Sequence, residues 1–394
     1  MKVVRIGVIG VGNMGAAHVK SIVEGNVPEA VVTAVADVNE ERLCAIKATY
    51  KDAFAYFNNA EDLLDSGLVD AVIIATPHYD HPPLAIAAFS RGLHVLSEKP
   101  TGVYTRQVRE MNEAADKAGV KFGVNFCQRT TAAYRWIKET VASGKYGRIR
   151  RIVWHVTKWY RSQGYYNSGA WRATWAGEGG GVLLNQCPHN LDLWQWICGM
   201  PVKVRAFCHV GKWHDVEIED DVTAYMEYEN GAIGVFITST GDAPGTNRLE
   251  IVMDGATIIS EDRDKVTLVE LSEPEPEFSK KTTDGTYENF AQPGRTVITP
   301  TLPDPIPGTP SEGVISAFVA SILHDTPMLA DGKEGIKSLT LSNAMYLSSW
   351  LDSEIVLPID EDLYYEELSK RIATSRLKSS KSVYTDDIAK TYNK

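Results

Sequence analysis

The first 126 residues alternate six short apolar runs with stretches long enough to form helices. The runs span residues 5–9, 31–36, 54–57, 69–75, 94–97 and 121–126. Several are nearly continuous in Val, Ile and Ala, which is typical of strands buried on both faces of a sheet. Helix-length segments, 81–91 and 105–118 among them, lie between the runs. Strands that alternate with helices predict an α/β fold with a doubly wound parallel sheet.

The part of the chain after residue 126 has a different pattern. A helix is predicted over 132–143, because Gly144 follows it as a natural C-cap. Segments with period-two alternation then predict strands over 150–160, 202–210, 222–228 and 232–238. Asn230-Gly231 lies between the last two and favours a tight hairpin. We therefore expect an α+β domain with a large, open, mostly antiparallel sheet.

Three segments follow from these patterns. We expect a first domain over 1–126, a second domain over 127–360 and a C-terminal arm over 361–394. The arm is polar and charged, and we expect it to pack on a neighbouring subunit or to be partly mobile. Within the second domain, a stretch rich in Pro and Glu predicts a long excursion over 273–310, and helices are predicted over 313–323 and 335–351.

Charge and cysteine content argue against several classes of protein. The formal net charge is -11, which disfavours nucleic acid and anionic membranes as partners. There is no apolar run of about 18 residues and no signal-peptide pattern. The five cysteines form no C-x-x-C pair, so a cytoplasmic location and no metal site are expected. The acidic trio Glu219-Asp220-Asp221 is interpreted as a turn or a solvated edge.

A glycine-rich loop follows the first predicted strand. Its spacing permits a tight turn, close approach of the backbone to a pyrophosphate and close packing of a helix on the strand. Asp37 ends the second strand and stands where an acid binds ribose hydroxyls and repels a 2'-phosphate. The cofactor is therefore predicted to be NAD, held by a Rossmann domain. The loop residues are Gly10, Val11, Gly12, Asn13, Met14 and Gly15.

Two further motifs carry a resemblance to a known family. The first is the segment 75–81 together with Glu98-Lys99-Pro100, and the second is the segment 179–192. With the glycine loop they resemble the glucose–fructose oxidoreductase/inositol dehydrogenase (Gfo/Idh/MocA) family, over nearly the whole chain. The resemblance implies that Lys99 and His189 flank the carbinol carbon that gives hydride to nicotinamide. Thr76, Pro77, His81 and Glu98 are expected at the cofactor cleft, on the carboxyl ends of the strands.

The chemistry of this pair agrees with the resemblance. Removing a hydroxyl proton while hydride leaves requires a base poised near neutrality. A lysine beside a cation in a partly dry pocket and a histidine both meet that need.

The second motif departs from the family pattern at two positions. Asn185 stands where the family usually has Asp, four residues before the histidine, and Cys187 stands where Gly is frequent. An amide orients a sugar hydroxyl but shares no proton with lysine. Asn185 is therefore expected to position substrate. Asp192 lies one helical turn after His189, where it either orients the imidazole or forms a charge pair.

The substrate is expected to be a sugar or glycoside. Aromatic residues crowd the segment before the glycine run, and flat rings suit the apolar faces of a pyranose. The candidates for substrate binding there are Tyr160, Trp171, Arg172 and Trp175. The motif resembles the branch of the family that oxidises C3 of intact glycosides. The alternatives are an inositol or monosaccharide dehydrogenase, a redox-neutral glycosidase that keeps its NAD, and a non-catalytic NAD-sensing regulator. The open sheet also predicts a homo-oligomer, a dimer or tetramer.

Overall fold

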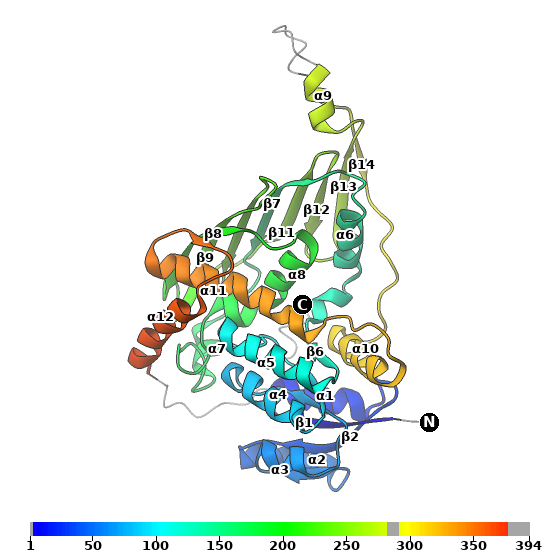
Figure 1. The fold of residues 1–394 in the computed structure, drawn as a ribbon, viewed down its shortest axis with the longest axis vertical. Coiled ribbons are helices and arrows are strands. Elements are labelled where there is room, and N and C mark those ends of the chain that lie inside the picture. The colour runs from blue at the N-terminus through cyan, green and yellow to red at the C-terminus, as the bar shows by residue number, and fades with distance from the viewer. Residues whose placement is uncertain (1–2, 282–290, 377–394) are drawn as a thin grey trace.

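The computed structural model describes residues 3–281 and 291–376, which form two sheets with their helices (Figure 1). The first sheet lies near the N-terminus, and the second rises from it with α6, α8 and α11 on one of its faces (Figure 1). Among the described residues, no helix combines the length and the apolar character needed to cross a membrane.

The first sheet is parallel throughout and has the strand order β3-β2-β1-β4-β5-β6. The predicted doubly wound sheet is therefore confirmed. Its strands are β1 (Val4–Ile9), β2 (Ala30–Ala36), β3 (Ala55–Phe57), β4 (Ala71–Ile74), β5 (His94–Ser97) and β6 (Phe122–Val124). The helices around it are α1 (Asn13–Val23), α2 (Glu40–Tyr50), α3 (Ala60–Asp65), α4 (His81–Phe89) and α5 (Thr105–Ala118), with single turns η1 (His78–Asp80) and η2 (Cys127–Thr130).

The second sheet is mixed, with the order β14-β13-β12-β11-β7-β10-β9-β8-β15. Its central strands β7 and β10 are parallel to each other, and the other recorded pairings are antiparallel, as predicted for most of the sheet. The hairpin predicted at Asn230-Gly231 joins β9 to β10. The strands are β7 (Ile149–Val156), β8 (Lys203–Val210), β9 (Glu219–Glu227), β10 (Ile233–Ser239), β11 (Asn247–Met253), β12 (Ala256–Glu261), β13 (Lys265–Leu271), β14 (Arg295–Ile298) and β15 (Ile355–Val356).

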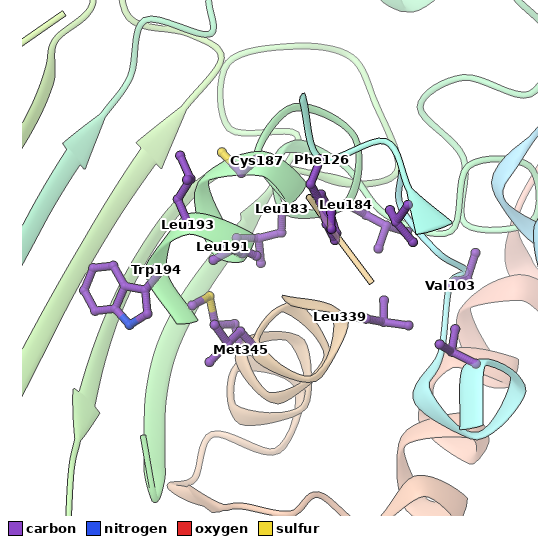
Figure 2. Packing of buried hydrophobic residues seen from close by; sticks show 14 of the residues in the cluster. Val103, Phe126, Leu183, Leu184, Cys187, Leu191, Leu193, Trp194, Leu339 and Met345 are labelled. Atoms are coloured by element: carbon purple, nitrogen blue, oxygen red, sulfur yellow. The ribbon is translucent and has the colours of Figure 1, made fainter. Parts of the chain in front are cut away.

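The helices of the second half cover one face of this sheet and link it to the first. They are α6 (Ala132–Ala142), α7 (Gln163–Asn167), α8 (Pro188–Cys198), α9 (Glu275–Lys281), α10 (Pro310–His324), α11 (Gly335–Leu351) and α12 (Glu361–Thr374), with a π-helical turn η3 (Val182–Gln186) and a 3-10 turn η5 (Gly332–Glu334). In Figure 2, Leu193 and Trp194 of α8 face the strands, while Leu339 and Met345 of α11 lie on the other side of α8. The Trp194 ring meets Phe236 edge-on at 5.8 Å between centroids. This packing fixes α8, which carries His189, between the sheet and α11.

Two helices differ from their sequence-based expectations. Helix α10 lies with the first sheet, because Val314 and Phe318 share a buried cluster with Ile6 and Val8 of β1. Helix α12 packs on its own chain and buries Tyr364 and Leu368, so residues 361–374 are not a separate arm. Residues 377–394 of the expected arm, and 282–290 of the expected excursion, lie outside the described residues.

The acidic trio is also a correction. Glu219 and Asp220 are buried in β9 instead of lying on a solvated edge. The Glu219 carboxyl accepts hydrogen bonds from the Gly181 and Leu183 N–H groups and from the Tyr346 hydroxyl. Its burial raises the pKa of Glu219 to about 7. The carboxyl thus holds the glycine run in place through its bonds to Gly181 and Leu183. These N–H groups and the Tyr346 hydroxyl replace the water that the carboxyl loses on burial.

Candidate active site

The glycine loop has the geometry that its spacing predicts. Gly10 follows β1 with a φ of +85°, a conformation that side chains rarely adopt. A Cβ atom on Gly15 would lie 1.8 Å from the Gly10 carbonyl oxygen. The N-cap Gly12 of α1 has no side-chain cap, so the first turn offers N–H groups to an anion.

A cavity of about 560 Å³ opens beside this loop at the carboxyl ends of β1, β2 and β4. Gly10, Asp37, Thr76 and Pro77, four of the residues predicted to bind the cofactor, line it. The Asp37 carboxylate is fixed by the N–H groups of Val11 and Asn39, each at 2.8 Å. The Thr76 hydroxyl is buried and has no hydrogen-bond partner within the described part of the chain. An unpartnered hydroxyl, an oriented carboxylate and an uncapped helix fit the ribose and phosphates of a dinucleotide.

His81 and Glu98, which were predicted at the cofactor cleft, contact other parts of the protein in this structure. His81 is buried, and its two ring nitrogens lie 2.7 Å from the Pro100 carbonyl oxygen and 2.8 Å from that of Thr76. It therefore ties the end of β4 to the turn after Lys99, and it is not among the residues that line the cavity.

Glu98 is likewise used by protein partners. Its Oε1 lies 2.8 Å from His18 Nε2 and accepts a hydrogen bond of 2.6 Å from the Asn125 amide. Burial by itself raises the pKa of Glu98, but the bonds to His18 and Asn125 outweigh it and lower the pKa to about 2. The carboxylate stays ionised and fixes the residue that precedes Lys99.

Lys99 and the second motif meet directly. Lys99 Nζ donates a 2.8 Å hydrogen bond to the backbone oxygen of Asn185 in the π-helical turn η3. Lys99 follows β5 of the first sheet and Asn185 precedes α8, which packs against the second sheet. The contact joins two segments 86 residues apart and places the lysine at the boundary between the two halves.

His189 lies in the first turn of α8, in a dry environment. Its Nε2 is 3.8 Å from the Cys127 sulfur, and its ring meets Phe126 edge-on at 6.3 Å. Nδ1 is buried without a hydrogen-bond partner among the described residues. Burial, reinforced by the charge of Lys99, lowers the pKa of His189 to about 3. This differs from the expectation of an imidazole that titrates near neutrality, because the structure removes the water that stabilises its charged form.

The buried imidazole makes folding stability depend on pH. The folded-state pKa of about 3 lies below the ordinary value of 6.5, so between these values the unfolded chain binds the additional proton. Stability from this group is complete above pH 6.5 and falls as the pH decreases towards 3. At pH 5 we expect His189 to cost about 2 kcal/mol of unfolding free energy.

Urea unfolding at pH 7.5 and pH 5.0 measures this cost. The difference between the two unfolding free energies should be smaller in His189→Gln than in the unmodified chain by that amount. The same pH dependence in both proteins would contradict the assignment. His78 and His81, whose pKa values are also lowered by burial, remain in both proteins and cancel.

Asp192 forms a charge pair and does not contact the imidazole of His189. Its two oxygens accept hydrogen bonds of 2.6 and 2.8 Å from the Arg129 guanidinium, which also donates 2.6 Å to Glu334. The Arg129 and Asp192 side chains are 2% and 1% exposed. The triad links η2, α8 and η5, with Glu334 as its partly exposed member, and so holds the helix that carries His189.

Asn185 is one member of a polar cluster. Its amide nitrogen donates to the carboxylate of Glu178 and, at 3.3 Å, to the hydroxyl of Tyr165. The same hydroxyl accepts bonds from Arg172 at 2.8 Å and Gln186 at 3.2 Å. Glu178 is buried and also accepts the Ala173 N–H at 2.6 Å. Asn185 therefore connects Lys99, through its backbone, to a buried carboxylate, through its side chain.

The four predicted substrate-binding residues near the glycine run have different positions. Arg172 lies over the rings of Tyr165 and Trp171, at 4.6 and 4.5 Å. Trp171 meets His78 edge-on at 5.5 Å, so these two border the cluster around Asn185. Trp175 is buried against Tyr346 and Trp350 and belongs to the core. Tyr160 is 51% exposed.

Sequence reasoning overlooked Glu178, His18, Asn125 and Arg42. Glu178 directly precedes the glycine run, and an acid beside three glycines was the available signal. His18 and Asn125 carry no signal, since they become relevant only when helix α1 and the end of β6 meet Glu98. Arg42 lines the cofactor cavity, with Nη1 3.6 Å from Asp37 Oδ2.

Two family models match this chain. Residues 4–126 match the model described as the oxidoreductase family, NAD-binding Rossmann fold. Residues 134–259 match the GFO/IDH/MocA C-terminal domain. The chain belongs to the GFO/IDH/MocA family. The predicted family and the predicted NAD-binding Rossmann domain are confirmed, and the GFO/IDH/MocA chain matches both domain models.

Curated relatives of this GFO/IDH/MocA chain include proteins named as sugar or cyclitol oxidoreductases. The 1,5-anhydro-D-fructose reductase of Ensifer adhaerens is 32% identical over 180 residues, 45% of this chain and 53% of that protein. The myo-inositol 2-dehydrogenase of Thermotoga maritima is 27% identical over 273 residues, 67% of this chain and 77% of that protein. The chain spans little more than half the length of the first two curated relatives it matches, 53% and 57%.

Solved structures extend the likeness to nearly the whole fold. The WlbA dehydrogenase from Bordetella pertussis, in complex with NADH and UDP-GlcNAcA, has a TM-score of 0.76 and 27% identity, and covers 91% of this chain and 100% of that one. A levoglucosan dehydrogenase with NADH and L-sorbose has a TM-score of 0.75 at 21% identity, covering 91% and 100%; it shows the fold alone.

Cofactor preference provides a prediction that needs no substrate. Asp37→Ser should tighten NADPH binding relative to NADH by at least ~10-fold, because a carboxylate beside the 2'-phosphate costs several kcal/mol and Arg42 remains to pair with it. Nicotinamide fluorescence titration gives both dissociation constants. Arg42→Ala in the Asp37→Ser background should remove the gain. An unchanged ratio in Asp37→Ser would show that Asp37 does not set the preference.

Proposed function

We propose that this protein oxidises a ring hydroxyl of a sugar, C3 of a glycoside in first place, and passes the hydride to NAD, with Lys99 and His189 as its acid/base pair. The observation that carries the proposal is the 2.8 Å bond from Lys99 Nζ to the Asn185 backbone oxygen. It joins the lysine that follows β5 of the first sheet to the turn that precedes His189.

The residues of the site fit the proton part of this reaction. Bound NAD supplies a hydride acceptor at C4 of its nicotinamide. Lys99 Nζ takes the hydroxyl proton of the sugar while the carbon beside that hydroxyl loses its hydride. His189 is neutral and its unpartnered Nδ1 is a hydrogen-bond site for the same hydroxyl. Phe126 and Cys127 around His189 exclude water from this proton transfer.

Cyclitols form the second candidate substrate class. The relatives include inositol 2-dehydrogenases, and a cyclitol presents the same secondary hydroxyls to Lys99 and His189. Arg172, Tyr165 and Trp171 border the site and offer a cation, a hydroxyl and a flat ring to either class.

Absorbance at 340 nm separates the candidates. Purified protein with NAD is mixed with glycosides, with inositols and with free monosaccharides, and products are analysed by mass spectrometry. A rising signal with glycosides and a keto-glycoside product support the proposal, whereas a signal confined to inositols selects the second class. Glycoside cleavage without net NADH indicates a redox-neutral glycosidase. No change with any substrate rejects the dehydrogenase and favours an NAD-sensing regulator.

The uncovered face of the second sheet supports a homo-oligomer. On β8 and β9, Ala206 and Ala224 point into the core, so the alternating Phe207 and Tyr225 point away from it. These two rings are 50% and 39% exposed. We expect Phe207→Glu with Tyr225→Glu to give a monomer in analytical ultracentrifugation, because both charges would be buried in an interface. Val23→Glu, an exposed position on α1, should leave the assembly intact; a monomeric unmodified chain would reject this proposal.

A further inference from the structure

Glu178 is a buried carboxyl group in the polar cluster around Asn185. It is 1% exposed. Its Oε2 accepts the Ala173 N–H at 2.6 Å, its Oε1 accepts the side-chain amide of Asn185, and Arg172 Nη1 lies 3.9 Å away. Every contact places this carboxyl within the cluster around Asn185, and none connects it to solvent.

The charged and titratable groups around Glu178 come from three segments. Arg172 and Lys99 favour its ionised form, while burial is the larger effect and raises the pKa of Glu178. His78 places Nδ1 2.9 Å from the Glu178 backbone oxygen and stays neutral, because burial lowers its pKa well below the usual value. Tyr166 interacts electrostatically with the same carboxyl. The carboxyl is thus buried among Arg172, Lys99, His78 and Tyr166.

Lys99 interacts with two buried carboxyls of different character, Glu98 and Glu178. Glu98 contacts His18 and Asn125 through Oε1 and accepts the Lys99 backbone N–H through Oε2 at 3.2 Å. Glu178 shares Asn185 with Lys99: the amide nitrogen bonds to Glu178, and the backbone oxygen accepts the Lys99 bond. One asparagine therefore links the Glu178 carboxyl to the Lys99 amine through two hydrogen bonds.

We propose that Glu178 is a positioning residue for the Lys99 proton transfer: it orients the Asn185 amide and supplies the negative charge that balances Lys99 when the lysine becomes cationic. This inference rests on the proposed function. In the step, the sugar O–H bond breaks and an N–H bond forms on Lys99, while the C–H electron pair leaves as hydride to NAD and a C=O bond remains. The amine gains one positive charge, and Glu178 is the buried carboxylate linked to it through Asn185.

Because Glu178 and Asn185 share one hydrogen bond, exchanging acid and amide provides a direct test. A nearby negative charge favours the cationic form of the Lys99 amine. In Glu178→Gln this charge is lost, so the acidic limb of the pH profile of kcat/KM for sugar oxidation should move to lower pH by about one unit. The high-pH plateau should fall several-fold, since a weaker base remains. The double variant Glu178→Gln with Asn185→Asp moves the carboxylate from position 178 to position 185 and keeps a hydrogen bond between the two side chains. It should return the acidic limb of the pH profile to its original position.

Glu219→Gln is the matched control. This residue is also a buried glutamate that holds the glycine run, through Gly181 and Leu183, and it makes no contact with Asn185. Its loss should lower thermal stability and leave the acidic limb in place. A limb that stays fixed in Glu178→Gln, or an exchanged pair that behaves like Glu178→Gln alone, overturns the proposal.

A second measurement separates this inference from the proposed function. The rate at which Lys99 is reductively methylated, measured by peptide mass spectrometry across a pH series, reports amine protonation without turnover. The midpoint should move with Glu178→Gln and return in the exchanged pair. If no sugar is oxidised but the midpoint moves in this way, the charge coupling stands and the proposed function fails. If sugars are oxidised and neither the limb nor the midpoint moves, only the role of Glu178 fails.

Discussion

Lys99→Ala is expected to lower kcat for sugar oxidation roughly 10²- to 10⁴-fold, the range that a positioned acid/base group contributes. Without the amine, the hydroxyl proton loses the stronger base of the proposed pair, because the lowered pKa of His189 makes its imidazole a weak proton acceptor. NADH affinity should change little, since the glycine loop, Asp37 and Thr76 are untouched. Stopped-flow absorbance at 340 nm gives the rate of hydride transfer, and fluorescence titration gives the NADH affinity.

Lys138→Ala is a matched control for this variant. Lys138 also donates its ammonium to a backbone oxygen, that of Trp196, but it lies on α6, away from the cofactor cavity. Its replacement should leave kcat close to that of the unmodified protein. Hydride transfer at an unchanged rate in Lys99→Ala would show that the lysine is not the proton acceptor.

Arg129→Met should lower the unfolding free energy by about 3–5 kcal/mol, the usual cost of leaving a buried charge without its partner. Asp192 and Glu334 would lose the cation between them, and Asp192 has no exposure through which water could replace it. Because Asp192 lies one helical turn after His189, the loss should also loosen the start of α8. Urea unfolding at pH 7.5 measures the stability.

Arg109→Met is the exposed counterpart. Arg109 also pairs with two carboxylates, Glu113 and Glu361, but its side chain is 46% exposed. Surface pairs contribute about 0–1 kcal/mol, so its loss should be small. The double variant Arg129→Met with Asp192→Asn should recover part of the loss by removing the stranded charge. Equal costs for Arg129 and Arg109 would show that burial does not strengthen the triad.

The sequence predicted the first domain closely because its signals are local. Strand β5 and helix α5 have the ends expected from their apolar pattern, and Gly10 and Gly15 have the close contacts that their spacing requires. The prediction for the acidic trio was wrong because it also used local signals alone. Three neighbouring acids predict a solvated segment. The burial of Glu219 is possible because distant segments supply its hydrogen-bond donors, from Gly181, Leu183 and Tyr346.

The sequence by itself determined the family, the dinucleotide loop and the candidate pair Lys99 and His189, because each is encoded by residues a few positions apart. Tertiary structure alone decided the electrostatics of the site. It buried His189 until its pKa fell to about 3, turned Asp192 towards Arg129, and placed Glu178 on the amide of Asn185. Charge stabilisation depends on distance and on excluded water, and both are set by segments that meet only in the folded chain.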